Sequence, residues 1–318
     1  MSVARVERFI KRIISSLNVK ETRAPASPRP PRRYEWSIGL YTGKSPFDLQ
    51  PAAKALNPVL TRADITDVPT NGGADPFMLR IQNRWFMFFE VMNLETQRGE
   101  IALAVSDNGL NWRYQQVVLR EPFHLSYPYV FEWNDAIYMV PESWQSHSVR
   151  LYKATSFPLQ WSFVKTLLHG RDLVDSSLVH FQKKWWLFAS HGEAPYRADT
   201  LCLFYADDLL SEWREHPKSP IVDRNPHIAR PGGRVFVIDG KVTRYAQDCS
   251  PTYGRQVRAF AVREMTAKTY DEGSISENPV ISGTGSGWNA NGMHHIDPHL
   301  LADGGWLACV DGYRSIPC

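Results

Sequence analysis

The stretch "GGADPFMLRIQNRWFMFFE", residues 72–90, holds two apolar runs on either side of a short polar turn, and an acid stands near each end of the pair, Asp75 and Glu90. Two such runs with so short a connection predict a β-hairpin, because a parallel crossover needs a dozen or more residues. Four later segments repeat the pattern, at residues 126–142, 174–190, 231–247 and 295–311. The chain therefore contains five copies of one hairpin, which indicates a repeat architecture.

A second pattern follows each of the first four hairpins: an apolar strand, a turn and an aromatic residue, as in "IALAVSDNGLNW" at 101–112. Together the two patterns make four-stranded units, which are typical of propeller blades. The last hairpin lacks this second half, but residues 36–60 resemble it. We therefore expect an all-β fold, a five-bladed β-propeller over residues 34–318, closed by N-terminal strands that pair with the C-terminal blade. The alternative, an open sandwich of short hairpins, would not explain why the two ends of the chain complement each other.

Residues 1–33 carry much of the positive charge, with nine Lys or Arg against two Glu, while the rest of the chain holds 27 Lys or Arg against 31 Asp or Glu. Apolar residues from Val3 to Leu17 recur at helical spacing between the basic ones, which predicts a basic amphipathic helix. The following "APASPRPPRR" predicts a proline-rich linker. Such a helix suits an anionic membrane surface or a partner. The alternative, which has equal weight, is that this helix packs on its own domain or is disordered in isolation.

The cysteine spacing and the apolar runs of the sequence indicate where in the cell the protein is located. The four cysteines, at 202, 249, 309 and 318, show no zinc-type or CxxC spacing, no signal peptide precedes them, and no apolar run approaches the length of a membrane span. We therefore expect reduced thiols and a cytoplasmic location, with the helix allowing peripheral attachment to the inner membrane face. The acidic balance of the propeller argues against a nucleic-acid partner.

The ends of the hairpin strands predict the site. In a blade the innermost strand runs along the axis and the second returns antiparallel to it, so the residue before the first and the residue after the second emerge at one rim. Closely spaced acids in a partly desolvated funnel should have separated pKa values, as acid–base catalysis requires. Each polar residue taken singly could instead cap a turn or be solvated. The aligned positions predict a polar mouth made of Asp75, Glu90, Tyr127, Glu142, Asp175, Ser190, Arg230, Gln247, Asp248, His294, His295, Asp297 and Asp311.

The segment "GMHHIDPH" at 292–299 raises the question of a metal ion, since His294, His295, Asp297 and His299 are close in sequence. Adjacent residues on a strand point to opposite faces, so the two neighbouring histidines are poor joint ligands unless the backbone turns there. We expect no catalytic metal and no other certain cofactor, and allow a structural ion on the propeller axis.

Two motifs carry a resemblance to a known superfamily. "ADPF" at 74–77 and "VDSSL" at 174–178 each open the first strand of a blade and resemble motifs of the propeller glycoside hydrolases of the furanosidase type. The resemblance implies that Asp75 is the base or nucleophile and that Asp175 orients and tunes it. Where that superfamily has an "EGP"-like motif with the acid, this chain has "ARPGG" with Arg230. The acid would then have to come from Glu142 or Asp248.

A closer resemblance covers nearly the whole propeller. The motifs "WSIGLYTG", "HLSYPYVFE", "VPES", "ARPGG", "AQDCS" and "MHHIDPH" are similar to those of the domain at the N-terminus of plant glucosamine inositolphosphorylceramide transferases. Bacterial relatives of that domain are associated with surface-glycan pathways. In the plant proteins sugar transfer is assigned to a separate C-terminal domain, which this chain lacks.

These resemblances favour a carbohydrate-active enzyme, and first a glycosyltransferase that moves a sugar, with a furanose as one candidate, from a nucleotide-linked or lipid-linked donor to a glycan or lipid-linked acceptor. Asp75 would deprotonate the acceptor, while Arg230, Arg255, His294 and His295 would hold the departing phosphate. Glu90, Tyr127 and Asp297 complete the expected substrate-binding set. An intracellular glycoside hydrolase is the second reading, and a glycan-binding propeller without catalysis is the third.

Overall fold

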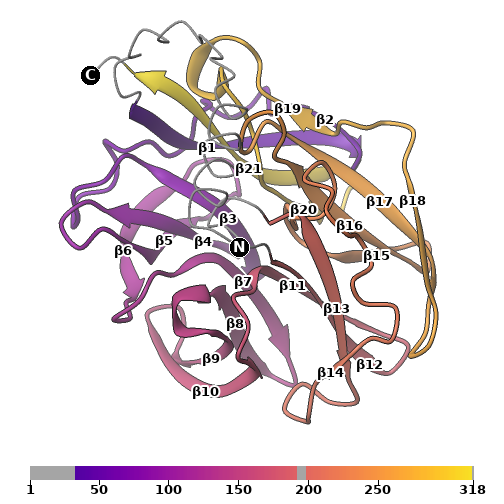
Figure 1. The fold of residues 1–318 in the computed structure, drawn as a ribbon. Coiled ribbons are helices and arrows are strands. Elements are labelled where there is room, and N and C mark those ends of the chain that lie inside the picture. The colour runs from indigo at the N-terminus through magenta and orange to yellow at the C-terminus, as the bar shows by residue number, and fades with distance from the viewer. Residues whose placement is uncertain (1–32, 192–197, 317–318) are drawn as a thin grey trace, which may run out of the picture. The chain divides into compact units, whose positions relative to one another are not determined.

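The computed structural model describes residues 33–191 and 198–316, which form a ring of β-sheets (Figure 1). Figure 1 shows successive sheets following one another around a centre, in the order of the colour bar. The first blade holds β3 (Gly73–Ile81), β4 (Arg84–Asn93), β5 (Arg98–Ser106) and β6 (Arg113–Leu119). The second holds β7 (Ser126–Trp133), β8 (Ala136–Glu142), β9 (Ser148–Ser156) and β10 (Gln160–His169).

The later blades vary this plan. The third holds β11 (Val174–Phe181), β12 (Lys184–His191), β13 (Thr200–Ala206) and β14 (Arg214–Glu215). The fourth holds β15 (Phe236–Ile238), β16 (Lys241–Asp248), β17 (Gln256–Met265) and β18 (Tyr270–Ser274), with β19 (Ile281–Ser282) also pairing with β17. Two 3₁₀ turns, η1 (Trp144–Ser146) and η2 (Gly287–Asn289), are the helical elements of the described residues.

The fifth blade joins the two ends of the chain. Its strands run in the order β2 (Asp48–Pro51), β1 (Arg33–Ser45), β21 (Trp306–Ile316) and β20 (Ile296–Leu300). Ile38 also bridges Leu60, so the segment up to residue 60 takes part in the closure. The predicted five-bladed fold and its closure by N-terminal strands are confirmed. The predicted basic helix and most of its linker, residues 1–32, lie outside the described residues.

Apolar side chains fill the space between blades. Phe88 of β4 is fully buried and meets the edge of Trp161 of β10, with ring centroids 5.3 Å apart. Burying an aromatic side chain of this size contributes about 1.5–3 kcal/mol, so contacts between blades hold the ring together. Among the described residues, no helix is long and apolar enough to span a bilayer.

Side chains also close the axis. The hydroxyl of Tyr127 accepts a hydrogen bond from the Gly233 N–H at 2.7 Å and lies 2.8 Å from Ser177 Oγ, so three blades meet at one phenol. Further along the axis, Arg234 pairs with Asp297 and donates to backbone carbonyls of the first two blades. Side chains of several blades therefore fill the axis at these two levels.

Candidate functional site

A repeated β-bulge aims the first set of side chains into the mouth. Asp75, Tyr127 and Asp175 occupy matching positions in β3, β7 and β11, and their φ angles are 52°, 45° and 52°. At each of these points the register with the second strand shifts, so that two residues of the inner strand face one of its partner. A left-handed backbone is uncommon for residues with a side chain. Its use at three equivalent positions turns each side chain toward the axis.

The second strands deliver the other set, as predicted. The ends of these strands bring Glu90, Glu142, Ser190, Gln247 and Asp311 to the same rim. The Gln247 amide donates to Asp175 at 2.7 Å, and Asp311 accepts from the backbone N–H of Asp75 at 2.9 Å. Polar residues from all five blades therefore meet in one buried network.

Asp175 is held as a carboxylate. Arg230 binds it through Nε at 2.5 Å and Nη2 at 3.3 Å, and Arg230 also lies 3.7 Å from Glu142. Burial alone would raise the pKa of Asp175, but the adjacent Arg230 outweighs it, and the pKa lies below the ordinary value. Burial, with the charge of Asp175 beside it, raises the pKa of Glu142 well above its ordinary value. Arg230 therefore serves as counter-ion to a carboxylate–carboxylic acid pair.

Asp75 lies between the two histidines. His294 Nδ1 lies 2.7 Å from Asp311 and 3.9 Å from Asp75, and His295 Nδ1 lies 3.7 Å from the same Asp75 oxygen. Burial raises the pKa of Asp75 to about 7. Burial opposes a charge on His294, but Asp311 outweighs it and the pKa of His294 rises to about 9. Burial lowers the pKa of His295 to about 4, so at neutral pH His294 is charged and His295 is neutral.

Of the two adjacent histidines only His294 belongs to the candidate cation set of the described residues, in keeping with the expectation that the two are poor joint ligands. Residues 293–295 precede β20 rather than belonging to it, and the backbone N–H groups of both His294 and His295 donate to Asp311. This turn sends both rings toward Asp75. Ligand atoms of Asp75, His294 and Asp311 all lie within 4.8 Å of one another, so these three could hold a cation in place of the His294 proton.

Glu90 is the most accessible acid of the mouth. Its side chain is 16% exposed, against 7% for Asp75 and 1% for Asp175. Burial raises the pKa of Glu90 to about 8, with the neighbouring Asp75 adding to the rise. His124, from the loop before β7, lies 3.6 Å from it through Nε2. At neutral pH the accessible acid of the mouth is therefore mostly protonated.

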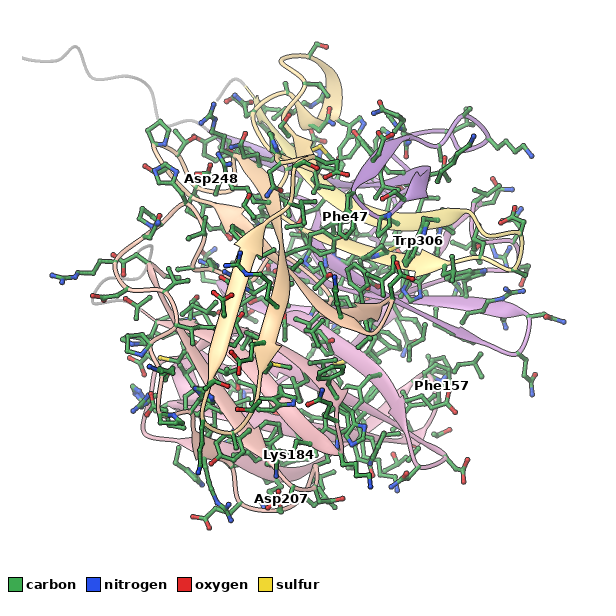
Figure 2. All side chains as sticks on the ribbon, turned by 90° about the vertical axis from the view of Figure 1, so that its right-hand side faces the viewer. Phe47, Phe157, Lys184, Asp207, Asp248 and Trp306 are labelled. Atoms are coloured by element: carbon green, nitrogen blue, oxygen red, sulfur yellow. The ribbon has the colours of Figure 1, made fainter. Side chains whose placement is uncertain are left out.

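Three predicted site residues lie elsewhere. Asp248, which is labelled in Figure 2, pairs with Arg258 and His227 and accepts from Gln256, on the opposite face of β16 from Gln247. Asp297 lies deeper on the axis, bound to Arg234 and to the Met78 N–H. Arg255 is exposed, and its backbone N–H donates to the Asp248 carbonyl. The structure does not bring these three into the acid cluster.

The sequence matches known proteins over this whole propeller. Residues 30–313 match the family model described as "Glucosamine inositolphosphorylceramide transferase 1, N-terminal". The chain belongs to this family. It is 38% identical over 323 residues to glucosamine inositolphosphorylceramide transferase 1 of Oryza sativa subsp. japonica, covering 95% of this chain and 43% of that protein. The protein of the same name from Arabidopsis thaliana is 36% identical over 298 residues, covering 88% of this chain and 39% of that protein.

The chain thus spans less than half the length of these curated relatives. Solved structures of other proteins share the fold of this N-terminal domain. The catalytic domain of the Coprinopsis cinerea GH62 α-L-arabinofuranosidase matches with a TM-score of 0.56 at 15% identity, over 82% of this chain and 84% of that one. A thermostable family-43 glycoside hydrolase matches with a TM-score of 0.55 at 14% identity, over 77% and 90%.

In this member of the transferase N-terminal family, three residues of the mouth were not predicted as site residues. They are His124, Tyr253, whose ring lies 5.2 Å from the Arg230 guanidinium carbon, and Trp36, whose ring lies 4.6 Å from that of His294. His124 and Trp36 open the motifs "HLSYPYVFE" and "WSIGLYTG", and Tyr253 follows the motif "AQDCS" by three residues. The motifs gave a signal, but the hairpin alignment did not, because these residues come from loops and from β1.

A polar cleft lies on the mouth side of the second and third blades. It has a volume of about 550 Å³ and includes His191 at the end of β12. Two side-chain pairs line it, His147 with Asp172 and Arg171 with Glu215.

Proposed function

We propose that the propeller transfers a glycosyl group to a hydroxyl of a glycan or lipid-linked acceptor, with Asp75 as the base. The relatives are named glucosamine inositolphosphorylceramide transferases, and the name supports a sphingolipid glycan as the ligand of the mouth, while their assigned transfer domain lies outside the matched part. The observation that carries the proposal is the placement of Asp75 at the mouth with a pKa of about 7. A base is most effective when its pKa lies near the working pH.

The remaining residues position this base. Asp311 accepts from the Asp75 N–H and holds the His294 charge beside it. Asp175 stays ionised through Arg230, and its negative charge raises the pKa of Asp75. A peripheral position on an anionic cytoplasmic membrane surface, through the basic residues 1–33, would bring lipid-linked acceptors within reach and stays a prediction.

Hydrolysis is the second candidate, and one observation favours it. Water can replace the acceptor hydroxyl at the same base, and the protonated Glu90 could supply the proton that a departing sugar needs. The two reactions differ only in the acceptor. They are separated by product analysis of one incubation, since free sugar reports hydrolysis and a glycosylated added alcohol or glycan reports transfer.

The test is Asp75→Asn, which keeps the shape of the side chain and removes the base. Wild type and variant would be incubated with aryl glycosides and with nucleotide sugars, with a glycan acceptor, and products followed by mass spectrometry. We expect turnover to fall roughly 10²- to 10⁴-fold while ligand affinity is retained. The exposed Asp64→Asn is the matched control and should keep full turnover. A wild type that binds glycans tightly and turns none over would identify a binding module instead.

A further inference from the structure

The balance of charges in the mouth restricts the chemical class of sugar donor that can bind there. Within the described part of the mouth, the cations that reach the acid cluster are Arg230 and His294, and both are already paired. Asp75, Glu90 and Glu142 remain as acids without a cation of their own. Arg230 is balanced by Asp175 and His294 by Asp311, so neither offers an unpaired positive charge to a departing diphosphate. This balance favours an uncharged donor over a diphosphate-linked one.

Glu90 is placed differently from the other acids. The Gly99 N–H donates to His124 Nδ1 at 2.9 Å, so in the neutral ring the proton sits on Nε2. Burial lowers the pKa of His124 to about 4, so the ring is neutral at pH 7. Nε2 lies 3.6 Å from Glu90 Oε1. A neutral imidazole N–H therefore faces the Glu90 carboxyl group just beyond hydrogen-bond distance and adds no charge to it.

We propose that Glu90, positioned by His124, donates a proton to the leaving oxygen of an uncharged glycoside donor. This rests on the proposed glycosyl-transfer function and names its donor class. The geometry that carries it is the accessible carboxyl group at the end of β4, the imidazole N–H that faces it, and the absence of an unpaired cation among the described mouth residues.

The step balances in protons and electrons. The bond between the anomeric carbon and the leaving oxygen breaks, its electron pair goes to that oxygen, and the Glu90 proton neutralises it. The acceptor hydroxyl forms the new bond to the anomeric carbon and gives its proton to Asp75. Glu90 ends as a carboxylate and Asp75 as an acid, and exchange with solvent restores both. No metal, oxidant or phosphate is required.

The charges around the two groups agree with these roles. Glu90 faces Asp75 of β3, Asp175 of β11, Arg230 ahead of β15 and His294 ahead of β20, as well as His124. The pKa of Glu90, about 8, is higher than that of Asp75, about 7, so Glu90 holds its proton more tightly than Asp75 does.

The experiment is Glu90→Gln assayed against donors of different leaving groups. The dinitrophenolate group of a dinitrophenyl glycoside departs without being protonated. The alcohol of an alkyl glycoside of the same sugar departs only when its oxygen receives a proton. We expect the variant to keep turnover of the dinitrophenyl donor within about 10-fold and to lose roughly 10²- to 10⁴-fold on the alkyl donor. The matched control is Glu100→Gln, which changes a buried acid on the neighbouring strand β5 that pairs with Arg120, and it should affect both donors equally.

A second readout does not depend on turnover. The infrared difference spectrum between wild type and Glu90→Gln should show a protonated carboxyl band at pH 6 that is lost with a midpoint near pH 8. His124→Phe should move this midpoint upward, because the Nε2 proton no longer favours the carboxylate. A carboxyl that is already ionised at pH 6 overturns the proposal.

The kinetic outcomes separate this inference from the proposed function. Equal losses on both donors in Glu90→Gln, with Asp75→Asn inactive, would reject Glu90 as the acid and keep the base. Turnover of nucleotide sugars alone would reject the uncharged donor and keep glycosyl transfer. Full activity of both variants would reject the function itself.

Discussion

Arg230 illustrates at the scale of one residue how the mouth depends on charge compensation. Its guanidinium is buried against Asp175 and Glu142, so Arg230→Met would leave Asp175 without its cation. Breaking a buried ion pair from one side costs about 3–5 kcal/mol. The folded pKa of Asp175 lies below its ordinary value, so the stability it contributes is present at neutral pH and is lost as the pH falls through the folded pKa.

We therefore expect Arg230→Met to lower the free energy of unfolding by about 3–5 kcal/mol at pH 7, measured by urea titration. The loss should shrink as the pH falls below neutral, because burial without Arg230 raises the pKa of Asp175 and the carboxyl group becomes protonated. Arg171→Met removes an exposed pair with Glu215 and should cost within about 1 kcal/mol. A loss for Arg230→Met no larger than that of the control would show that the buried pair does not matter for stability.

Single residues also show where sequence reasoning succeeded and where it stopped. The fixed offset between the two ends of each hairpin predicted Glu90, Glu142 and Gln247 at the mouth, and all three are there. The same reasoning placed Asp248 beside Gln247. Neighbouring residues on a strand face opposite ways, so only one of the two can enter the cluster, and the alignment could not say which. Loop residues such as His124 had no repeat position from which to be predicted.

At the scale of an element, the inner strands carry information that the apolar pattern hides. The hairpin registers follow the predicted offset, with Phe77 facing Phe88 and Ser177 facing Phe188. The bulge at Asp75 and Asp175 adds one residue without changing the pattern of apolar runs, so the sequence showed the hairpin but not the turn of the side chain toward the axis. The fold was predictable because it depends on repetition, whereas the site depends on these local departures.

The segment just before β15, at the inner edge of the fourth blade, allows a prediction at the scale of an element. Gly233 has φ +144° and bridges Ile296 of the fifth blade, and a Cβ there would lie 1.8 Å from the Ile296 carbonyl oxygen. Gly233→Ala should therefore separate the two blades and destabilise by well over the roughly 1–2 kcal/mol of a left-handed alanine. Gly240→Ala, with φ +71° and open space around it, should cost only that smaller amount by thermal unfolding. Equal costs would contradict the close approach.

For the whole molecule, closure of the ring by β1 is the feature on which the mouth depends. β1 covers the edge of β21 that carries Asp311 and buries Ile38 and Leu40 completely. Trp36 on the same strand packs its ring 4.6 Å from that of His294, so the closing strand also supports the site. An uncovered edge strand would pair with other chains.

Deleting residues 1–51 removes β1 and β2, and deleting residues 1–32 leaves both in place. We expect the longer deletion to lower Tm by roughly 10 °C or more and to form aggregates in size-exclusion chromatography, because several buried apolar side chains and a paired edge are lost together. The shorter deletion should leave Tm within about 2 °C of the full chain, since the covered edge is unchanged. If the protein with the longer deletion stayed monomeric with an unchanged Tm, the fifth blade would be stable with β20 and β21 alone. Asp311 and the histidines would then keep their positions without the closing strand.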